Sequence, residues 1–289
     1  MSDRGKNDFR LPDKGRVQLE KWPTRVAPIY KSHRDYEHQL RESVETLSDL
    51  QNRLYASSRY AILLIFQALD AAGKDGTISH VLSGVNPQGC DVHSFKQPSA
   101  LELSHDFLWR AYTALPARGR IGVFNRSYYE EVLVVRVHPE LLAKEGLPDA
   151  PRGHALWKDR YRSIVHMEKH LHRNGTRILK FFLHLSKDEQ RKRFLARIDD
   201  ESKNWKFNPQ DVEERQYWDP YMQAYEECLK ATHTRHAPWF VIPADDKENA
   251  RLLVAAAVVR EMRALKLEYP QLDPAHVKEL QAMRKTLKD

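Results

Sequence analysis

The chain has 289 residues, 41% of them hydrophobic, which is enough to bury one large α/β core. Its net charge of +7 raises the local concentration of anions, although many proteins carry such a charge without a specific partner. The longest apolar run, residues 252–259, is far shorter than the roughly 20 residues of a bilayer span, and the first ten residues lack the apolar segment of a secretory signal. Cys90 and Cys228 have no zinc-site spacing. We therefore expect a cytoplasmic protein without membrane contact, disulfide or zinc.

The N-terminal part of the chain divides into an arm, a helix and a strand. Residues 1–30 are polar and proline-containing, which predicts an arm that lies over the body or stays mobile. From Ser32 to Leu54, hydrophobic side chains recur at steps of three and four, which predicts an amphipathic helix. Residues 61–66 form a continuous apolar run, typical of a strand that is covered on both faces.

The rest of the chain alternates between strands and helices. Apolar runs predict strands at residues 91–95, 121–124, 178–185 and 239–242. Helical patterns lie at residues 76–82, 99–115, 154–172, 188–198, 212–231 and 248–265. This alternation indicates an α/β protein with a doubly wound, parallel, five-stranded sheet flanked by helices. Ligands of such sheets bind at the carboxyl ends of the strands, so we expect the chemistry in the loops after Phe66 and Phe124.

We expect three parts in the chain. Residues 1–30 form the arm, and residues 31–266 form one kinase-like domain with a lid at about residues 187–212. Residues 267–289 form a helical tail that packs on the body or on another subunit.

The loop after the first strand has the composition of a phosphate-binding loop. A strand, a small-residue turn and a helix N-terminus present free backbone N–H groups and a positive dipole end to an anion. The residues expected to contact phosphate are Ala71, Ala72, Gly73, Lys74, Asp75, Gly76 and Thr77. Lys74 supplies the point charge. The alternative is a tight turn that only begins a helix.

This loop departs twice from the usual G-x-x-x-x-G-K-[ST] pattern. Ala68 replaces the first Gly, and Asp75 replaces the Ser or Thr whose hydroxyl helps to hold magnesium. Asp70, inside the loop, is the candidate magnesium ligand, because oxygen ligands suit a hard cation that phosphate oxygens also hold.

A second cluster of polar residues follows the strand at residues 121–124. Asn125 stands where many P-loop enzymes carry a magnesium-organising carboxylate. Arg126 is suited to bind phosphate oxygens and to offset charge in the transition state, and the alternative is a structural ion pair with Glu130 or Glu131.

The charged segment 188–206 resembles a lid. On a helical wheel, Arg193 and Arg197 share one face and can point into a cleft. With Lys203 and Lys206 they would close over phosphates and expel water, and the alternative is an ordinary solvated helix face.

These residues together resemble the polyphosphate kinase 2 family, and specifically its third class, whose members accept both AMP and ADP. The resemblance runs from about Tyr30 to Arg260 and rests on the stretches LLIFQALDAAGKDGTI, SGVNPQGCDVHSFKQPS, HDFLWR, GRIGVFNRSYYEEVLVVRVHPE, FFLHLSKDEQRKRFLARIDD, NWKFN and APWFVIPADDK. It implies a thymidylate-kinase-like fold with a lid, dependence on Mg²⁺, and transfer of a phosphoryl group from inorganic polyphosphate to a nucleotide. It also implies a homo-oligomer, with dimers that pair into a tetramer.

Carried over by residue, the resemblance implies that Asp70 organises magnesium and that Lys74 binds phosphate. Arg126 matches the arginine after the second strand, and Arg193 and Arg197 match lid arginines. Asn125 stands where ADP-preferring relatives carry Asp, which leaves open whether Asn125, Glu130 or water holds the metal from that side.

Two rival functions remain at this stage. An ATP-dependent nucleoside monophosphate kinase would share the architecture, but the two departures in the loop weaken the usual triphosphate cradle. A non-catalytic nucleotide- or RNA-binding protein would explain the basic charge. However, no aromatic and basic RNA-binding signature is present, and we expect no nucleic-acid partner.

Overall fold

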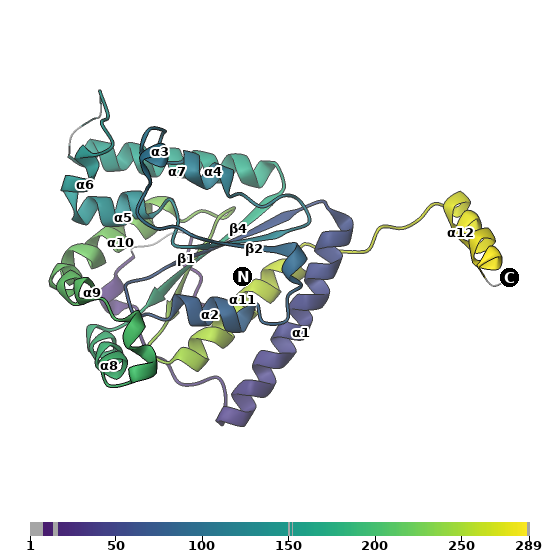
Figure 1. Cartoon of the computed structure of the whole chain (residues 1–289), viewed down its shortest axis with the longest axis horizontal. Helices are drawn as coiled ribbons and strands as arrows, with labels where there is room; N and C mark the ends of the chain where they lie inside the picture. Colours follow the sequence, from purple (N-terminus) through teal and green to yellow (C-terminus); the bar gives the residue numbers. More distant parts are fainter. Residues whose placement is uncertain (1–7, 14–16, 150, 152, 288–289) are drawn as a thin grey trace.

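The computed structural model describes residues 8–13, 17–149, 151 and 153–287, apart from the side chains of Lys203 and Lys206. One parallel sheet with the strand order β2-β3-β1-β4-β5 forms its centre (Figure 1). The strands are β1 (Ala61–Gln67), β2 (Cys90–Ser94), β3 (Ile121–Asn125), β4 (Thr176–His184) and β5 (Trp239–Pro243). The predicted fold class and the predicted strand positions are confirmed.

Helices cover both faces of the sheet. One face packs against α1 (His33–Ser57), α2 (Lys74–Val81) and α11 (Lys247–Arg263), and the other against α5 (Glu130–Val137), α7 (His154–Arg173) and α10 (Trp218–Thr232). Successive residues of β1 alternate between the two cores: Ile62, Leu64 and Phe66 face the first, whereas Leu63 and Ile65 face the second. Because both faces are covered, all seven residues of β1 are buried, which explains its continuous apolar sequence.

Two of the predicted helices are interrupted. The segment 99–115 forms α3 (Ala100–Leu103) and α4 (Trp109–Thr113), because the Asp106 carboxylate accepts a hydrogen bond from the backbone N–H of Leu108 and starts a new turn there. The segment 212–231 likewise divides into α9 (Pro209–Glu213), a 3₁₀ turn η4 (Glu214–Tyr217) and α10. The helices α5 and α6 (Pro139–Ala143) were not predicted from the sequence. The helix α8 (Lys187–Ile198) was predicted. The remaining 3₁₀ turns are η1 (Leu19–Lys21), η2 (Pro87–Gly89) and η3 (Glu201–Lys206).

The described part of the N-terminal arm lies along the edge strand β5. The N–H of Leu11 donates to the carbonyl of Trp239 and the N–H of Val241 donates to the carbonyl of Phe9, both at 2.9 Å. The indole of Trp22 donates to the carbonyl of Val241 at 2.9 Å. The arm thus covers one edge of the sheet with antiparallel backbone pairing.

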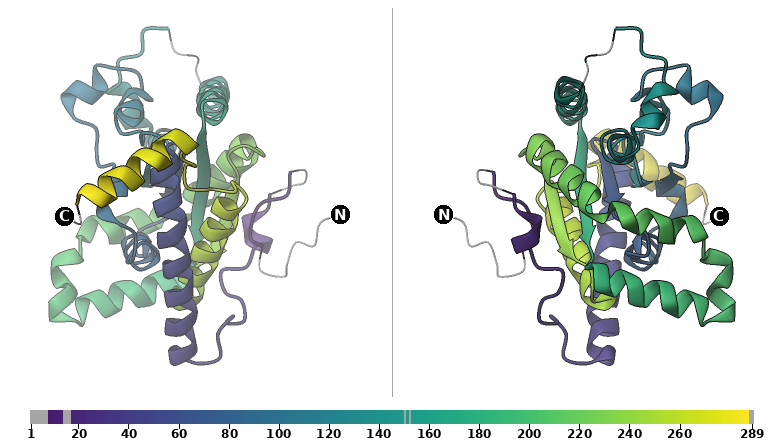
Figure 2. Two further views of the ribbon diagram at one scale, coloured as in Figure 1. Left: turned by 90° about the vertical axis from the view of Figure 1, so that its right-hand side faces the viewer. Right: turned by 90° about the vertical axis from the view of Figure 1, so that its left-hand side faces the viewer.

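The C-terminal helix α12 (Pro274–Thr286) stands away from the body at the end of an extended segment (Figures 1 and 2). All its residues are exposed, including the apolar Val277, Leu280 and Met283. The expectation that the tail packs on the body therefore does not hold, whereas packing on another subunit stays a prediction. Among the described residues, no helix has the length and apolar character needed to cross a bilayer.

Candidate active site

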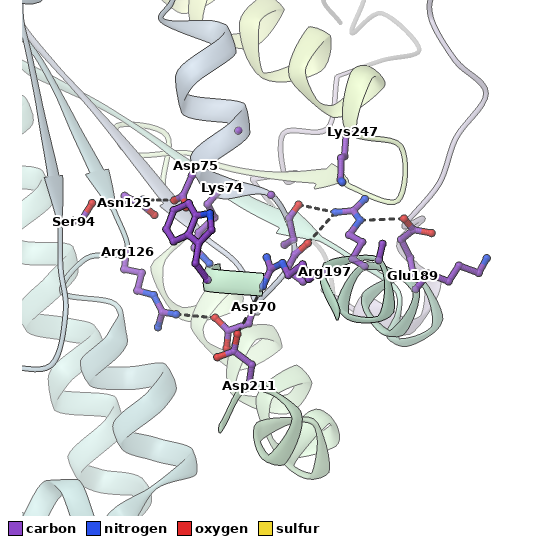
Figure 3. A pocket seen from close by; sticks show the side chains of 18 of the residues that line it. Asp70, Lys74, Asp75, Ser94, Asn125, Arg126, Glu189, Arg197, Asp211 and Lys247 are labelled. Carbon is purple, nitrogen blue, oxygen red and sulfur yellow. Dashed lines mark hydrogen bonds and ion pairs between the residues drawn. The ribbon is translucent and has the colours of Figure 1, made fainter. Parts of the chain in front are cut away.

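The loops after β1 and β3 open into one cavity of about 800 Å³, which we call the phosphate cavity (Figure 3). The strands β1 and β3 are neighbours in the sheet, so their carboxyl ends bring the two loops together. The predicted residues that line this cavity are Asp70, Ala71, Ala72, Gly73, Lys74, Asp75, Gly76, Asn125, Arg126, Arg193 and Arg197. Residues that are widely separated in the sequence thus share one site.

The loop between β1 and α2, residues 68–73, which we call the phosphate loop, has an unusual backbone. Ala71 has φ 62° and Gly73 has φ 95°, both in the left-handed region. The loop ends at Lys74, the first residue of α2, whose ammonium donates to the carbonyl of Ala68 at 2.9 Å. Burial lowers the pKa of Lys74, the charge of Arg126 lowers it further, and the carboxylate of Asp70 opposes both. Lys74 therefore places a positive charge at the N-terminus of α2, the end of a helix that favours anions.

Arg126 lies between two carboxylates. It donates to Asp70 at 2.8 Å (Figure 3). It also donates to Glu130 at 3.1 Å. The charge of Glu130 raises the pKa of Arg126, burial opposes this, and Asp70 raises it again. The ion pair with Glu130 is therefore present, and Arg126 also lines the phosphate cavity, while its contact with phosphate stays a prediction.

Asn125 connects the two loops. Its amide nitrogen donates to Asp75 at 2.7 Å, the residue that replaces the usual Ser or Thr (Figure 3). This bond leaves the amide oxygen of Asn125 as the atom that it can offer to a cation.

The two expected lid arginines have different surroundings. Arg193 is 6% exposed and donates to backbone carbonyls of the phosphate loop and of the loop after β5. Arg197, one turn further along α8, is 24% exposed and lies 3.8 Å from Asp211. Arg193 is thus built into the body, in contrast to the mobile lid expected for it, and Arg197 remains at the wall of the cavity.

Two other predicted residues, Thr77 and Glu130, do not line the described wall of the phosphate cavity. Thr77 is 4% exposed and lies within α2, where its side chain faces the core. Glu130 pairs with Arg126 and accepts a hydrogen bond from the Gln67 amide at 2.7 Å. It lines the neighbouring cavity instead. The side chains of Lys203 and Lys206 lie outside the described part of the structure.

Several cavity residues were missed from the sequence. They are Lys96, Lys192, Asp211 and Lys247, together with Ser94, Phe95, Glu189, Ala196 and Trp205. Figure 3 shows Asp211 next to Asp70, and burial together with the charge of Asp70 raises the pKa of Asp211, which Arg197 opposes. Asp211 belongs to α9, near the end of the expected lid segment, and no motif marks it.

The phosphate cavity adjoins a second cavity of about 770 Å³, which we call the acceptor cavity. Its walls include apolar and aromatic side chains, among them Val134, Leu141, Tyr217 and Tyr221. The two cavities share four residues at their boundary, namely Asp70, Phe95, Lys96 and Arg126. A ligand in one cavity can therefore reach a ligand in the other at the position of Asp70 and Arg126.

Two carboxylates of the phosphate cavity have the chemistry that a magnesium ion requires. Among the described residues, no group of three or more His, Cys, Asp or Glu side chains could enclose a metal. Magnesium is usually held by one or two carboxylates together with phosphate oxygens and water. Asp70 and Asp211, which both line the phosphate cavity, are such a pair of carboxylates.

The fold and this site define a P-loop phosphotransferase, with a parallel sheet, a phosphate loop between β1 and α2, and cations that converge on that loop. The chain belongs to the polyphosphate kinase 2 family, whose family model matches residues 30–270. It is 63% identical over 280 residues to the ADP-polyphosphate phosphotransferase of Rhodopseudomonas palustris, a match that covers 96% of this chain and 97% of the relative. It is 45% identical over 232 residues to the AMP/ADP-polyphosphate phosphotransferase of Meiothermus ruber, covering 80% and 83%.

The solved structures include a polyphosphate kinase 2 from Arthrobacter aurescens that superimposes with a TM-score of 0.85. It is 38% identical in sequence, and the match covers 95% of each chain.

Proposed function

We propose that this protein transfers the terminal phosphoryl group of inorganic polyphosphate to AMP and ADP. The observation that carries the proposal is the meeting of two cavities of different character at Asp70 and Arg126. One cavity is built for a chain of phosphates, and the other for a nucleoside. The boundary is the place where a phosphate of each substrate would meet.

The phosphate cavity suits polyphosphate as the donor because it is lined by cationic side chains outside the phosphate loop as well as by Lys74. Lys192 and Arg197 from α8 and Lys247 from α11 line the same cavity as Lys74. If ATP were the donor, these three cations would lie opposite its ribose and base, which carry no negative charge. Polyphosphate carries a negative charge at every unit. The substitution of Asp75 for the usual Ser or Thr also weakens the cradle that P-loop enzymes offer to ATP.

The acceptor cavity suits a nucleoside because it combines apolar walls with polar edges. Val134, Leu141 and Tyr217 provide surface against which a base can pack, and Glu213 and Glu214 provide carboxylates that can accept hydrogen bonds from amino and hydroxyl groups. The names of the relatives from Rhodopseudomonas palustris and Meiothermus ruber support ADP, and AMP with ADP, as acceptors.

The reaction is an in-line displacement at phosphorus. An oxygen of the nucleotide's terminal phosphate forms a bond to the terminal phosphorus of polyphosphate, and the bond to the bridging oxygen breaks, so that its electron pair leaves with the shortened polyphosphate. The attacking oxygen is already anionic, so no general base is required. Lys74, Arg126 and Arg197 offset the charge that spreads over the equatorial oxygens. Asp70 and Asp211 would hold magnesium, which when bound supplies a further positive charge at the phosphates.

The test is an incubation of the protein with magnesium, AMP or ADP, and either polyphosphate or ATP, followed by separation of the nucleotides. We expect ADP and ATP to form from AMP, and ATP from ADP, with polyphosphate as donor. Turnover of AMP only with ATP would instead identify a nucleoside monophosphate kinase. The absence of turnover with either donor would identify a binding protein.

We further propose a cytoplasmic homo-oligomer. The exposed apolar side chains of α12, which include Val277, Leu280 and Met283, support an assembly in which this helix packs on another subunit. Light scattering on the protein after gel filtration would give the mass of the particle, and a monomer would contradict this proposal.

A further inference from the structure

We propose that Gln190 and Arg193 of α8 are positioning residues that hold the phosphate loop in its anion-binding conformation. In this proposal they act on the loop from behind, and Arg193 does not contact phosphate. The inference rests on the proposed function only in that polyphosphate is taken as the ligand of the loop.

The two side chains hold three consecutive carbonyl groups of the loop. Gln190 donates to the carbonyl of Asp70 at 3.0 Å. One terminal nitrogen of Arg193 donates to the carbonyls of Ala71 and Ala72, at 3.2 and 2.9 Å. Carbonyls and N–H groups point in roughly opposite directions from a chain, so a loop that turns its N–H groups toward an anion must turn its carbonyls away. Those carbonyls need donors on the far side, and α8 supplies them.

This support also acts where the loop is strained. Ala71 has φ 62°, which is costly for a residue with a side chain, and its carbonyl is one of those that Arg193 holds. A loop in this conformation persists only if its surroundings fix it. Gln190 and Arg193, which are 3% and 6% exposed, are the buried polar contacts that reach it from α8.

The hydrogen-bonding capacity of Arg193 is fully used. A guanidinium has five N–H donors. Besides Ala71 and Ala72, Arg193 donates to Glu189 at 3.0 Å and to the carbonyls of Ala244 and Asp245 at 2.6 and 3.1 Å. Five donors meet five acceptors, so a phosphate could be bound only at the expense of one of these bonds. Lysine, with a single nitrogen, could not bridge the two loops that Arg193 joins.

The loop after β5, which Arg193 joins to the phosphate loop, is itself fixed to the body. The carboxylate of Asp245 accepts from the N–H of Ser186 at 2.8 Å and from the hydroxyl of Thr24 in the N-terminal arm at 2.9 Å. The start of α8 is thus tied to the loop after β5. A lid that moves must then bend beyond Arg193, which leaves Arg197 as the arginine of α8 that can approach phosphate and withdraw from it.

The test compares the binding of tripolyphosphate by four proteins: wild type, Arg193→Lys, Gln190→Leu and the control Arg191→Ala. Arg191 lies on the same helix but its side chain is 64% exposed, so its removal changes the charge without touching the loop. Binding is measured by titration calorimetry in magnesium buffer, and kcat and KM for polyphosphate are measured in parallel. Thermal unfolding confirms that each variant is folded.

We expect Arg193→Lys and Gln190→Leu each to weaken tripolyphosphate binding about tenfold, because each leaves loop carbonyls without donors. Arg191→Ala should stay within about twofold of wild type. The Gln190→Leu result is decisive, since this neutral side chain does not line the phosphate cavity. Wild-type affinity in Gln190→Leu, or full binding in Arg193→Lys, would overturn the inference.

Failure of the proposed function gives a different result. A wild type that binds tripolyphosphate but transfers nothing to AMP or ADP would contradict the proposed reaction. The comparison of affinities between Gln190→Leu and Arg191→Ala would still decide the role of the two positioning residues.

Discussion

The phosphate loop and the turn at Arg126 lie at the ends of adjacent strands and carry the same backbone strain. Ala71 has φ 62° and Arg126 has φ 63°. A left-handed conformation costs a residue with a side chain on the order of 1–2 kcal/mol. Each residue therefore depends on its surroundings, and the two surroundings are different.

The turn at Arg126 is held from the core. Two residues further on, the hydroxyl of Tyr128 donates to Glu168 at 2.9 Å, and that of Tyr129 donates to the same oxygen at 2.7 Å. Lys180 donates to Glu168 at 2.7 Å, and neither side chain of this pair is exposed. The N–H of Arg126 itself donates to the carbonyl of Phe66 at 3.0 Å. This turn belongs to the interior of the domain.

The phosphate loop is held from the base of the lid. Its carbonyls bond to Gln190 and Arg193 of α8, the helix that leads through Arg197 to Asp211. The phosphate loop thus takes its support from the first turns of α8, whereas the turn at Arg126 takes its support from buried side chains of the core.

The largest effect is expected from removing the cation of the phosphate loop. Lys74→Met should lower kcat about a thousandfold, because it removes a charge placed where negative charge develops. The protein should remain folded, because the Lys74 ammonium lies at the cavity wall and its hydrogen bond is to the carbonyl of Ala68, not to the core. Initial rates of ATP formation from ADP and polyphosphate measure the effect, with thermal unfolding as the control. A rate near that of wild type would exclude this loop as the donor site.

Breaking the buried support of the Arg126 turn should mainly affect stability. Lys180→Met leaves the Glu168 carboxylate buried without its counter-charge, which costs about 3–5 kcal/mol. The added change Glu168→Gln should recover part of this loss, because it removes the unpaired charge. Urea unfolding of the single and double variants measures both effects. Unchanged stability in Lys180→Met would contradict the role of this buried ion pair in holding the turn.

Acid should lower the free energy of unfolding through two buried histidines. Burial lowers the pKa of His184, beside Asp245, and of His233, near Lys180, each to about 4. The unfolded chain binds these protons near pH 6.5, so the free energy of unfolding should fall as the pH drops from about 6.5 to 4, by up to roughly 3 kcal/mol per histidine.

The free energy of unfolding, measured at several pH values between 7 and 4, gives the slope of stability against pH and tests this prediction. His184→Gln and His233→Gln should each flatten it, because glutamine does not titrate. An unchanged slope in both variants would show that other groups control the acid response.

The sheet and the two loops could be predicted from the sequence because their signals are local. A strand covered on both faces must be apolar throughout, and a phosphate loop must lie between such a strand and a helix. The break between α3 and α4 could not be predicted, because a single carboxylate, Asp106, decides it. Asp211 could not be found either, since only the return of the chain after α8 brings it to Asp70.

Arg193 shows the limit of helical periodicity. The wheel places Arg193 and Arg197 on one face, and both line the phosphate cavity. The wheel does not show what stands opposite each residue. Arg193 meets backbone carbonyls and Arg197 meets Asp211, so the same residue type on the same face has two different roles.

The smallest effect is expected at Ala71, and it tests the strain directly. Ala71→Gly removes the cost of the left-handed conformation, so it should stabilise the loop by about 1 kcal/mol or less. In wild type the gain in tripolyphosphate affinity should be slight, because Gln190 and Arg193 already hold the loop. In the Arg193→Lys background the same change should restore part of the lost affinity, which calorimetry of the double variant measures. A direct contact between Arg193 and phosphate predicts no such restoration, because glycine at position 71 would return no charge to the cavity.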